Sequence, residues 1–141
     1  MGNVINLFLK TAHQQPMWAV GDVKAVEGEG LEGDVSFGRS NRQVLLMESE
    51  VLGTYGLLPG SVRENITTRG IKLSGIEVGT RLQLGETHLE ITGDCTPCSF
   101  LDSLRPGLQD QIAGERGLLA RVITSGTIRV GDSVNVVEPT A

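Results

Sequence analysis

The chain has 141 residues and 39% of them are hydrophobic, which is enough to build a single domain around one buried core. Aromatic residues make up only 4%, so the core is expected to consist mainly of Val, Leu and Ile. The net charge is −5 and no block of basic residues occurs. This argues against a nucleic acid or an anionic membrane surface as the main partner.

The sequence also gives no sign of export or membrane insertion. No apolar run approaches the roughly 20 residues that are needed to cross a bilayer. The first ten residues lack the basic lead and the long apolar segment of a secretory signal, and Asn6 stands where a myristoylation motif needs Ser or Thr. With two cysteines and no export signal, the chain is expected to be cytoplasmic.

The first part of the chain predicts strands separated by turns. Apolar and β-branched residues predict strands at 4–9 and 20–26, with a polar loop at 11–17 between them. The glycine-rich segment 27–34 predicts turns, because glycine readily adopts positive φ. A further strand is predicted at 41–47, entered from a polar loop.

The next segment contains the first predicted helix. Residues 48–55 carry apolar side chains at helical spacing, and Gly56 is expected to end the helix. The Pro-Gly pair at 59–60 indicates a turn. Residues 64–70 are polar and β-branched, which fits a short strand or an extended loop.

The second half predicts two β-hairpins. In the first, residues 81–84 and 87–92 alternate between apolar and polar side chains on either side of a two-residue turn. In the second, residues 127–130 and 133–137 flank the Gly-Asp pair at 131–132 in the same way. Each pair is therefore expected to form an antiparallel ladder.

Short helices are predicted between the hairpins, at 100–104 and 108–113, followed by an apolar strand at 120–124. Many short strands with few helices indicate a mainly β domain, in which mixed or antiparallel strands curl into a barrel. One such domain is expected to span residues 1–141.

Cys95 and Cys98 form the densest cluster of nucleophiles or soft ligands in the sequence. A redox-active disulfide is one interpretation, although the surroundings are not thioredoxin-like. A structural zinc site would need two further ligands, and His13 and His88 have no ligand-like spacing to the pair. The remaining alternatives are two inert buried thiols and a thiolate that holds sulfur or a soft metal. The residues alone favour inert thiols.

Four segments, in their order and separation, resemble the MOSC family, the domain named after the C-terminal part of molybdenum cofactor sulfurases. The segments are residues 30–34 (GLEGD), 42–46 (RQVLL), 64–70 (ENITTRG) and 92–98 (TGDCTPC). The tail from Arg116 is similar as well, so the resemblance covers about residues 20–138.

The resemblance implies a β-barrel-like domain that binds the molybdenum cofactor or its sulfur and acts as a carrier or sulfur-transfer module. It also implies that Cys98 is the reactive residue, either as a ligand of molybdenum or as the carrier of a persulfide, both of which suit an accessible thiolate. The alternative is a small molybdenum-dependent reductase of N-hydroxylated compounds. Such an enzyme would need an electron-donor protein as a partner. A carrier would instead bind an enzyme that uses the cofactor.

The cofactor carries a phosphate, so its pocket is expected to present hydrogen-bond donors. Arg42 can bind a phosphate through its forked guanidinium. Asn65, Thr67 and Thr68 are the candidates for hydrogen bonds to the phosphate or to the pterin edge. For Asn65 the structural alternative is an ordinary turn or cap residue.

Three further residues are candidates with simple structural alternatives. Asp34 belongs to a matching segment and is predicted to bind the cofactor, but it also fits an Asx turn. Arg69 is predicted to bind the cofactor, and Arg69 or Arg116 would stabilise a thiolate if either lies close to it. A solvated surface charge is the simpler expectation for each arginine.

Overall fold

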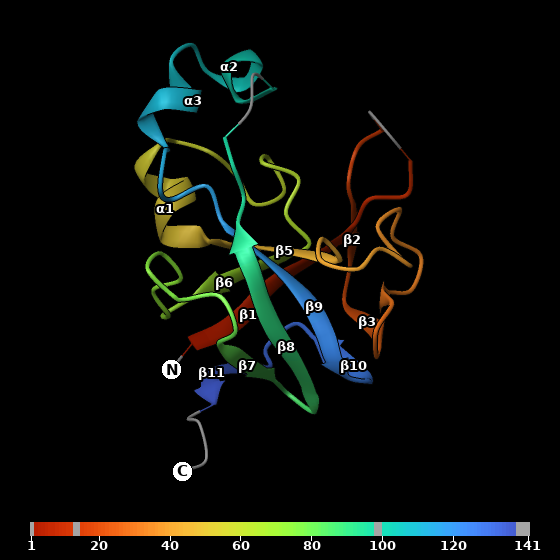
Figure 1. The fold of residues 1–141 in the computed structure, drawn as a ribbon. Coiled ribbons are helices and arrows are strands. Elements are labelled where there is room, and N and C mark those ends of the chain that lie inside the picture. Colours follow the sequence, from red (N-terminus) through yellow and green to blue (C-terminus); the bar gives the residue numbers. More distant parts are fainter. Residues whose placement is uncertain (1, 13–14, 98–99, 138–141) are drawn as a thin grey trace.

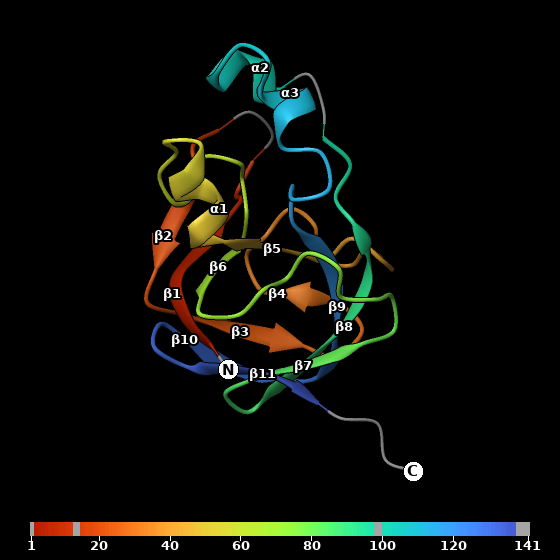
Figure 2. The same ribbon diagram turned by 90° about the vertical axis from the view of Figure 1, so that its left-hand side faces the viewer.

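Seven strands close into a barrel in this computed structural model, which describes residues 2–12, 15–97 and 100–137 (Figures 1 and 2). The strands are β1 (Gly2–Leu9), β2 (Trp18–Val20), β3 (Asp22–Val26), β4 (Gly30–Leu31), β5 (Val44–Glu48), β6 (Ile66–Arg69), β7 (Arg81–Leu84), β8 (Thr87–Asp94), β9 (Leu118–Thr124), β10 (Gly126–Arg129) and β11 (Ser133–Val137). The helices are α1 (Ser49–Thr54), α2 (Phe100–Leu104) and α3 (Leu108–Gln111).

The barrel follows the order β11-β7-β8-β9-β5-β6-β1, and pairing of β1 with β11 closes the ring. All neighbours are antiparallel except β5 and β6, which run parallel. The strand β2 extends the sheet beyond β1, and β10, β3 and β4 form a separate small sheet. The predicted mainly β barrel with a few short helices is therefore confirmed.

Two apolar clusters hold these elements together. Alternating Val, Leu and Ile side chains from the strands fill the barrel interior, as in Leu82, Leu89 and Ile91. A second cluster joins Met47 of β5 to apolar residues of the three helices. The helices accordingly lie together at one end of the barrel (Figures 1 and 2). None of the described helices is long and apolar enough to span a membrane.

Most predicted elements are confirmed, including the first strand, the helix after β5 and the hairpin of β7 and β8. The predicted strand at 20–26 is interrupted at Gly21, so that it forms the end of β2 and the whole of β3. These two strands belong to different sheets, which explains the break between them.

The second predicted hairpin is wrong. The strand β10 pairs with β3, whereas β11 pairs with β7 and β1. The turn between them is held by other strands: Val130 N donates to Gly21 O at 3.0 Å, and Gly131 N donates to Val4 O at 2.7 Å. These long-range bonds carry the chain from one sheet to the other instead of folding it back.

A glycine at the start of β9 is required by its surroundings. Gly117 has a φ of +122°, and a Cβ added there would lie 2.5 Å from the backbone oxygen of Leu46. Gly117 O also accepts a hydrogen bond from Cys95 N at 2.9 Å. The residue therefore fixes how the segment after β8 meets the segment before β9.

We expect Gly117→Ala to lower the free energy of unfolding by about 3 kcal/mol, because it combines backbone strain with overpacking. Gly53→Ala is the matched control, since Gly53 lies in α1 with open space around its Cβ position. That substitution is expected to raise stability by about 0.5–1 kcal/mol. Urea unfolding of both variants checks the prediction, and equal effects would contradict it.

Candidate functional site

The ends of several strands meet at the rim of the barrel that faces the helices. β1 ends just before Lys10, and β8 ends just before Cys95. β5 begins at Val44, and Asn65 and Gly117 directly precede β6 and β9. Because β1 and β8 run antiparallel to β6 and β9, all these positions come to the same rim.

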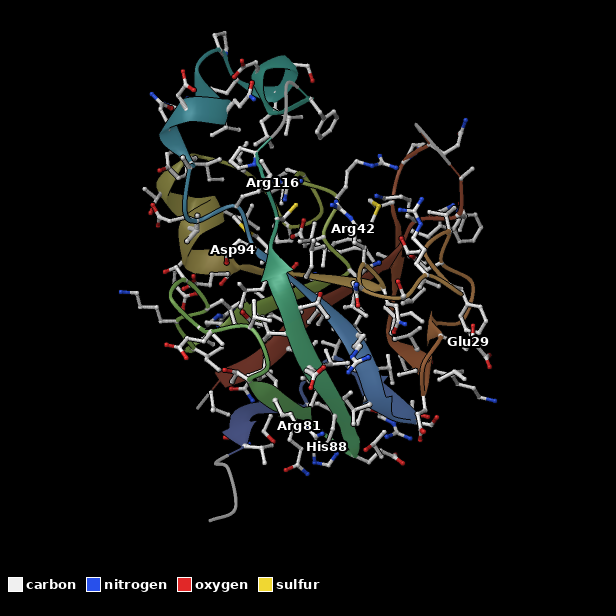
Figure 3. All side chains as sticks on the ribbon, in the orientation of Figure 1. Glu29, Arg42, Arg81, His88, Asp94 and Arg116 are labelled. Carbon is white, nitrogen blue, oxygen red and sulfur yellow. The ribbon has the colours of Figure 1, made fainter. Side chains whose placement is uncertain are left out.

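A cavity of about 430 Å³ opens at this rim. Its wall comes from the ends of strands, the loop between β4 and β5, the loop before β6 and the start of α2. The lining residues are Lys10, Asp34, Ser36, Arg39, Arg42, Gln43, Val44, Leu45, Val62, Arg63, Asn65, Cys95, Thr96, Phe100, Arg116 and Leu119. Figure 3 shows Arg42 and Arg116 in this region, whereas Arg81 and His88 lie at the opposite end of the barrel.

The cavity is strongly basic although the chain has a net charge of −5. Lysine or arginine supplies five of its described lining residues, and Asp34 is the one acidic residue among them. The carboxylate of Asp34 already accepts hydrogen bonds from Lys10 N at 2.7 Å, Ser36 N at 3.0 Å and Asn65 Nδ2 at 2.9 Å. Most of the positive charge in the cavity therefore has no carboxylate beside it.

Arg116 is the most deeply buried of these cations, with only 6% of its surface exposed. Its Nη2 donates to Val62 O at 2.8 Å, but the buried Nε and Nη1 have no partner among the described residues. A buried charge is costly unless it is paired and hydrogen-bonded. Such a guanidinium at the wall of a cavity is suited to hold an anion.

Two other cations, Arg63 and Lys10, line the same cavity as Arg116. Arg63 donates from Nη1 to Gln15 O at 3.0 Å, while its buried Nη2 has no partner among the described residues. Burial lowers the pKa of Lys10, and the positive charges of Arg63 and Arg116 lower it further, against the opposing effect of Asp34. Like charges therefore converge at the cavity.

The loop that carries Arg39 and Arg42 is fixed by the buried amide of Gln43. Its Nε2 donates to Gly28 O at 3.0 Å and to Arg39 O at 2.6 Å, and its Oε1 accepts from Val122 N at 2.9 Å. These bonds tie the loop to β9 and to the turn before β4. The predicted phosphate ligand Arg42 thus lies on an anchored segment of the wall.

Asp34 and Asn65 both line the cavity, but they hydrogen-bond to each other and to the backbone of neighbouring segments. Asn65 Oδ1 accepts from Leu45 N at 2.9 Å, and its Nδ2 donates to Phe8 O at 3.2 Å as well as to Asp34. Both amide donors are therefore engaged by the protein. The bond from Ser36 N to Asp34 Oδ2 is the expected Asx turn. Their predicted contacts with a cofactor stay predictions.

The other predicted binding residues lie away from the cavity wall. Thr67 is buried and donates from Oγ1 to Glu64 Oε2 at 2.7 Å, and Thr68 is also buried. Arg69 is exposed at the far end of β6.

Of the two cysteines, Cys98 lies outside the described residues. Cys95 lines the cavity as a free thiol with 8% of its surface exposed.

Several cavity residues were not among the sequence candidates. The contributions of Lys10, Arg39 and Arg63 depend on the convergence of three separate loops, which no local motif signals. The expectation that Arg116 is a solvated surface charge is wrong, because the residue is buried between the segments before β6 and β9. The one sequence feature that pointed to Arg116 was its place at the start of the tail that resembles the MOSC family.

Comparison with known proteins identifies a family for most of the chain. A sequence profile of the MOSC domain matches residues 38–135, which is more than half of the protein. The chain belongs to the MOSC domain family. No match was found among proteins with curated functions.

Solved structures of low sequence identity share the fold of this MOSC protein. The YuaD protein of Bacillus subtilis has 18% identity and a TM-score of 0.81, with 95% of this chain and 94% of that chain covered. YiiM from Geobacillus stearothermophilus has 21% identity and a TM-score of 0.74, covering 98% and 76%. YiiM from Escherichia coli has 18% identity and a TM-score of 0.77, covering 100% and 72%.

Glu64 holds the loop that brings Arg63 to the cavity. Its Oε2 accepts from Gly60 N at 2.8 Å as well as from Thr67, while its buried Oε1 has no partner among the described residues. Burial raises the pKa of the Glu64 carboxyl, and the hydrogen bonds from Gly60 and Thr67 partly oppose this rise. The folded protein consequently binds the proton of this group more tightly than the unfolded chain does.

A raised pKa stabilises the fold most below the ordinary value of 4.5, and this contribution is lost as the pH rises through the pKa of the folded state. In the wild type, this loss lowers the free energy of unfolding by at most about 1.4 kcal/mol per pH unit. We expect Glu64→Gln to remove the loss, because the amide does not titrate. Urea unfolding at a series of pH values above 4.5 should therefore show a shallower decline for the variant than for the wild type. Glu77→Gln, at an exposed position, is the control; an unchanged pH profile in Glu64→Gln would contradict the prediction.

Proposed function

We propose that the basic cavity binds the phosphorylated pterin of the molybdenum cofactor, and that the protein acts as a carrier or sulfur-transfer module with Cys98 as its reactive thiol. Membership of the MOSC family supports a function related to this cofactor. The observation that carries the proposal is the buried guanidinium of Arg116, with two nitrogen donors that have no partner among the described residues.

The residues present fit a phosphorylated heterocycle. The volume of about 430 Å³ falls within the range of small-molecule sites. Arg116 and Arg42 would hold the phosphate, because guanidinium groups form charge-assisted hydrogen bonds with its oxygens. Apolar side chains such as Leu45 and Phe100 complete the wall and would contact a ring.

The role proposed for Cys98 rests on the family resemblance and on its place in the sequence. It lies two residues after Thr96, which lines the cavity. When bound, the cofactor supplies a molybdenum centre, for which a thiolate is a suitable ligand. Neighbouring positive charge would favour the thiolate over the thiol, whether the sulfur binds metal or carries a persulfide.

Metal analysis tests the proposal on protein made in a host that synthesises the cofactor. We expect about one molybdenum and one pterin phosphate per wild-type chain, and at least a tenfold lower molybdenum content in Cys98→Ser, in line with the loss of a metal ligand. Cys95→Ser is the matched control and should retain its molybdenum. If the wild type carries neither molybdenum nor pterin, cofactor binding is refuted; if Cys95→Ser alone loses the metal, the assignment to Cys98 is wrong.

Two further readouts on the same samples separate the possible roles. A gain of one sulfur atom on the protein, dependent on Cys98 and detected by mass spectrometry, supports sulfur transfer. Turnover of an N-hydroxylated base with an artificial electron donor would instead identify a reductase, and would contradict the carrier assignment.

A further inference from the structure

Arg63 has an unusual backbone conformation. Its φ is +64°, and it is the one non-glycine residue with positive φ among the described residues. Side chains other than glycine meet steric conflict in this left-handed region, which makes the conformation unfavourable for them. Glycine adopts the same conformation without that cost. The turn before β6 would therefore be more stable with glycine at this position.

The surrounding loop imposes this conformation. Arg63 N donates to Gly60 O at 3.0 Å, and Gly60 N donates to the buried carboxylate of Glu64 at 2.8 Å. Two residues after Arg63, the side chain of Asn65 fixes the chain by accepting a hydrogen bond from Leu45 N. Residues on both sides thus determine the backbone of Arg63, and its side chain is directed to the cavity wall.

The side chain of Arg63 adds a second cost in the unliganded protein. Its guanidinium faces no carboxylate within salt-bridge distance among the described residues, because the described ion pairs join Arg121 to Glu90 and Arg129 to Glu86. Its positive charge contributes to the lowered pKa of Lys10, and it lines the same cavity as Arg116. Its one hydrogen bond within the described protein goes to an exposed carbonyl, Gln15 O.

We propose that Arg63 is an anion-binding residue of the cavity, and that its strained backbone is retained because its guanidinium joins that of Arg116 around a doubly charged oxyanion. The inference rests on the proposed function, since it concerns the same cavity, and it extends that function by assigning a specific phosphate ligand. Three nitrogen donors without partners among the described residues, Arg63 Nη2 with Arg116 Nε and Nη1, provide the contacts.

Phosphate monoesters match this arrangement better than carboxylates do. A terminal phosphate presents three oxygens and nearly two negative charges at neutral pH, so it can bind two guanidinium groups at once. A carboxylate offers one charge and two oxygens, and would leave part of the like-charge repulsion uncompensated. The terminal phosphate of a pterin or of another small heterocycle therefore fits the pair.

Two substitutions at position 63 separate strain from binding. Arg63→Ala removes the charge but keeps a side chain in the left-handed conformation, whereas Arg63→Gly removes both. Arg81→Ala is the control, because Arg81 is exposed on β7 at the opposite end of the barrel. For each variant, urea unfolding gives the folding equilibrium constant, and calorimetric titration with inorganic phosphate at constant ionic strength gives the dissociation constant.

We expect both Arg63 variants to bind phosphate at least about tenfold more weakly than the wild type, as expected for the loss of a charged hydrogen bond. We expect Arg63→Gly to fold with an equilibrium constant at least about fivefold larger than that of Arg63→Ala, and larger than that of the wild type. Arg81→Ala should bind phosphate as the wild type does.

Unchanged phosphate affinity in both Arg63 variants would overturn the inference, as would lower stability of Arg63→Gly than of the wild type. Failure of the proposed function gives a different result. Weakened phosphate binding in the Arg63 variants, together with wild-type protein that carries no molybdenum or pterin, would support the phosphate site and refute the cofactor.

Discussion

The buried guanidinium of Arg116, with two nitrogens that have no hydrogen-bond partner among the described residues, is the constraint around which the rim of the barrel is arranged. Moving an ionised group out of water costs several kcal/mol even after the protein relaxes. Here the one described hydrogen bond of the guanidinium goes to a backbone carbonyl, Val62 O, which leaves most of that cost in place. Lys10 increases it, because it brings charge of the same sign, and Arg63 adds another cation to the same cavity. A bound dianion would offset burial and repulsion together.

The parallel pairing of β5 and β6 makes this concentration of charge possible. It places the loops that precede both strands at one rim, where β1 and β8 also end. Asp34 and Asn65 then join these segments through buried hydrogen bonds. The single acidic residue of the described wall is thus engaged in holding the rim together, and the cations around it remain available to a ligand.

Sequence patterns predicted local structure well and tertiary structure less well. Alternation identified β7 and β8 as a hairpin because the two strands are joined by a tight turn. The same pattern failed for β10 and β11, whose partners come from the N-terminal third and from β7. Arg42 was predicted from a family segment. The burial of Arg116 and the contribution of Arg63 depend on contacts between distant loops, which neither alternation nor composition encodes.

A structure determined from crystals grown in phosphate buffer tests most directly the central claim, which is that Arg116 holds an anion in the cavity. We predict a phosphate in the cavity, with oxygens about 3 Å from Nε or Nη1 of Arg116. Ordered water alone on those nitrogens, or an Arg116 side chain turned to pair with a carboxylate of the protein, would contradict the account.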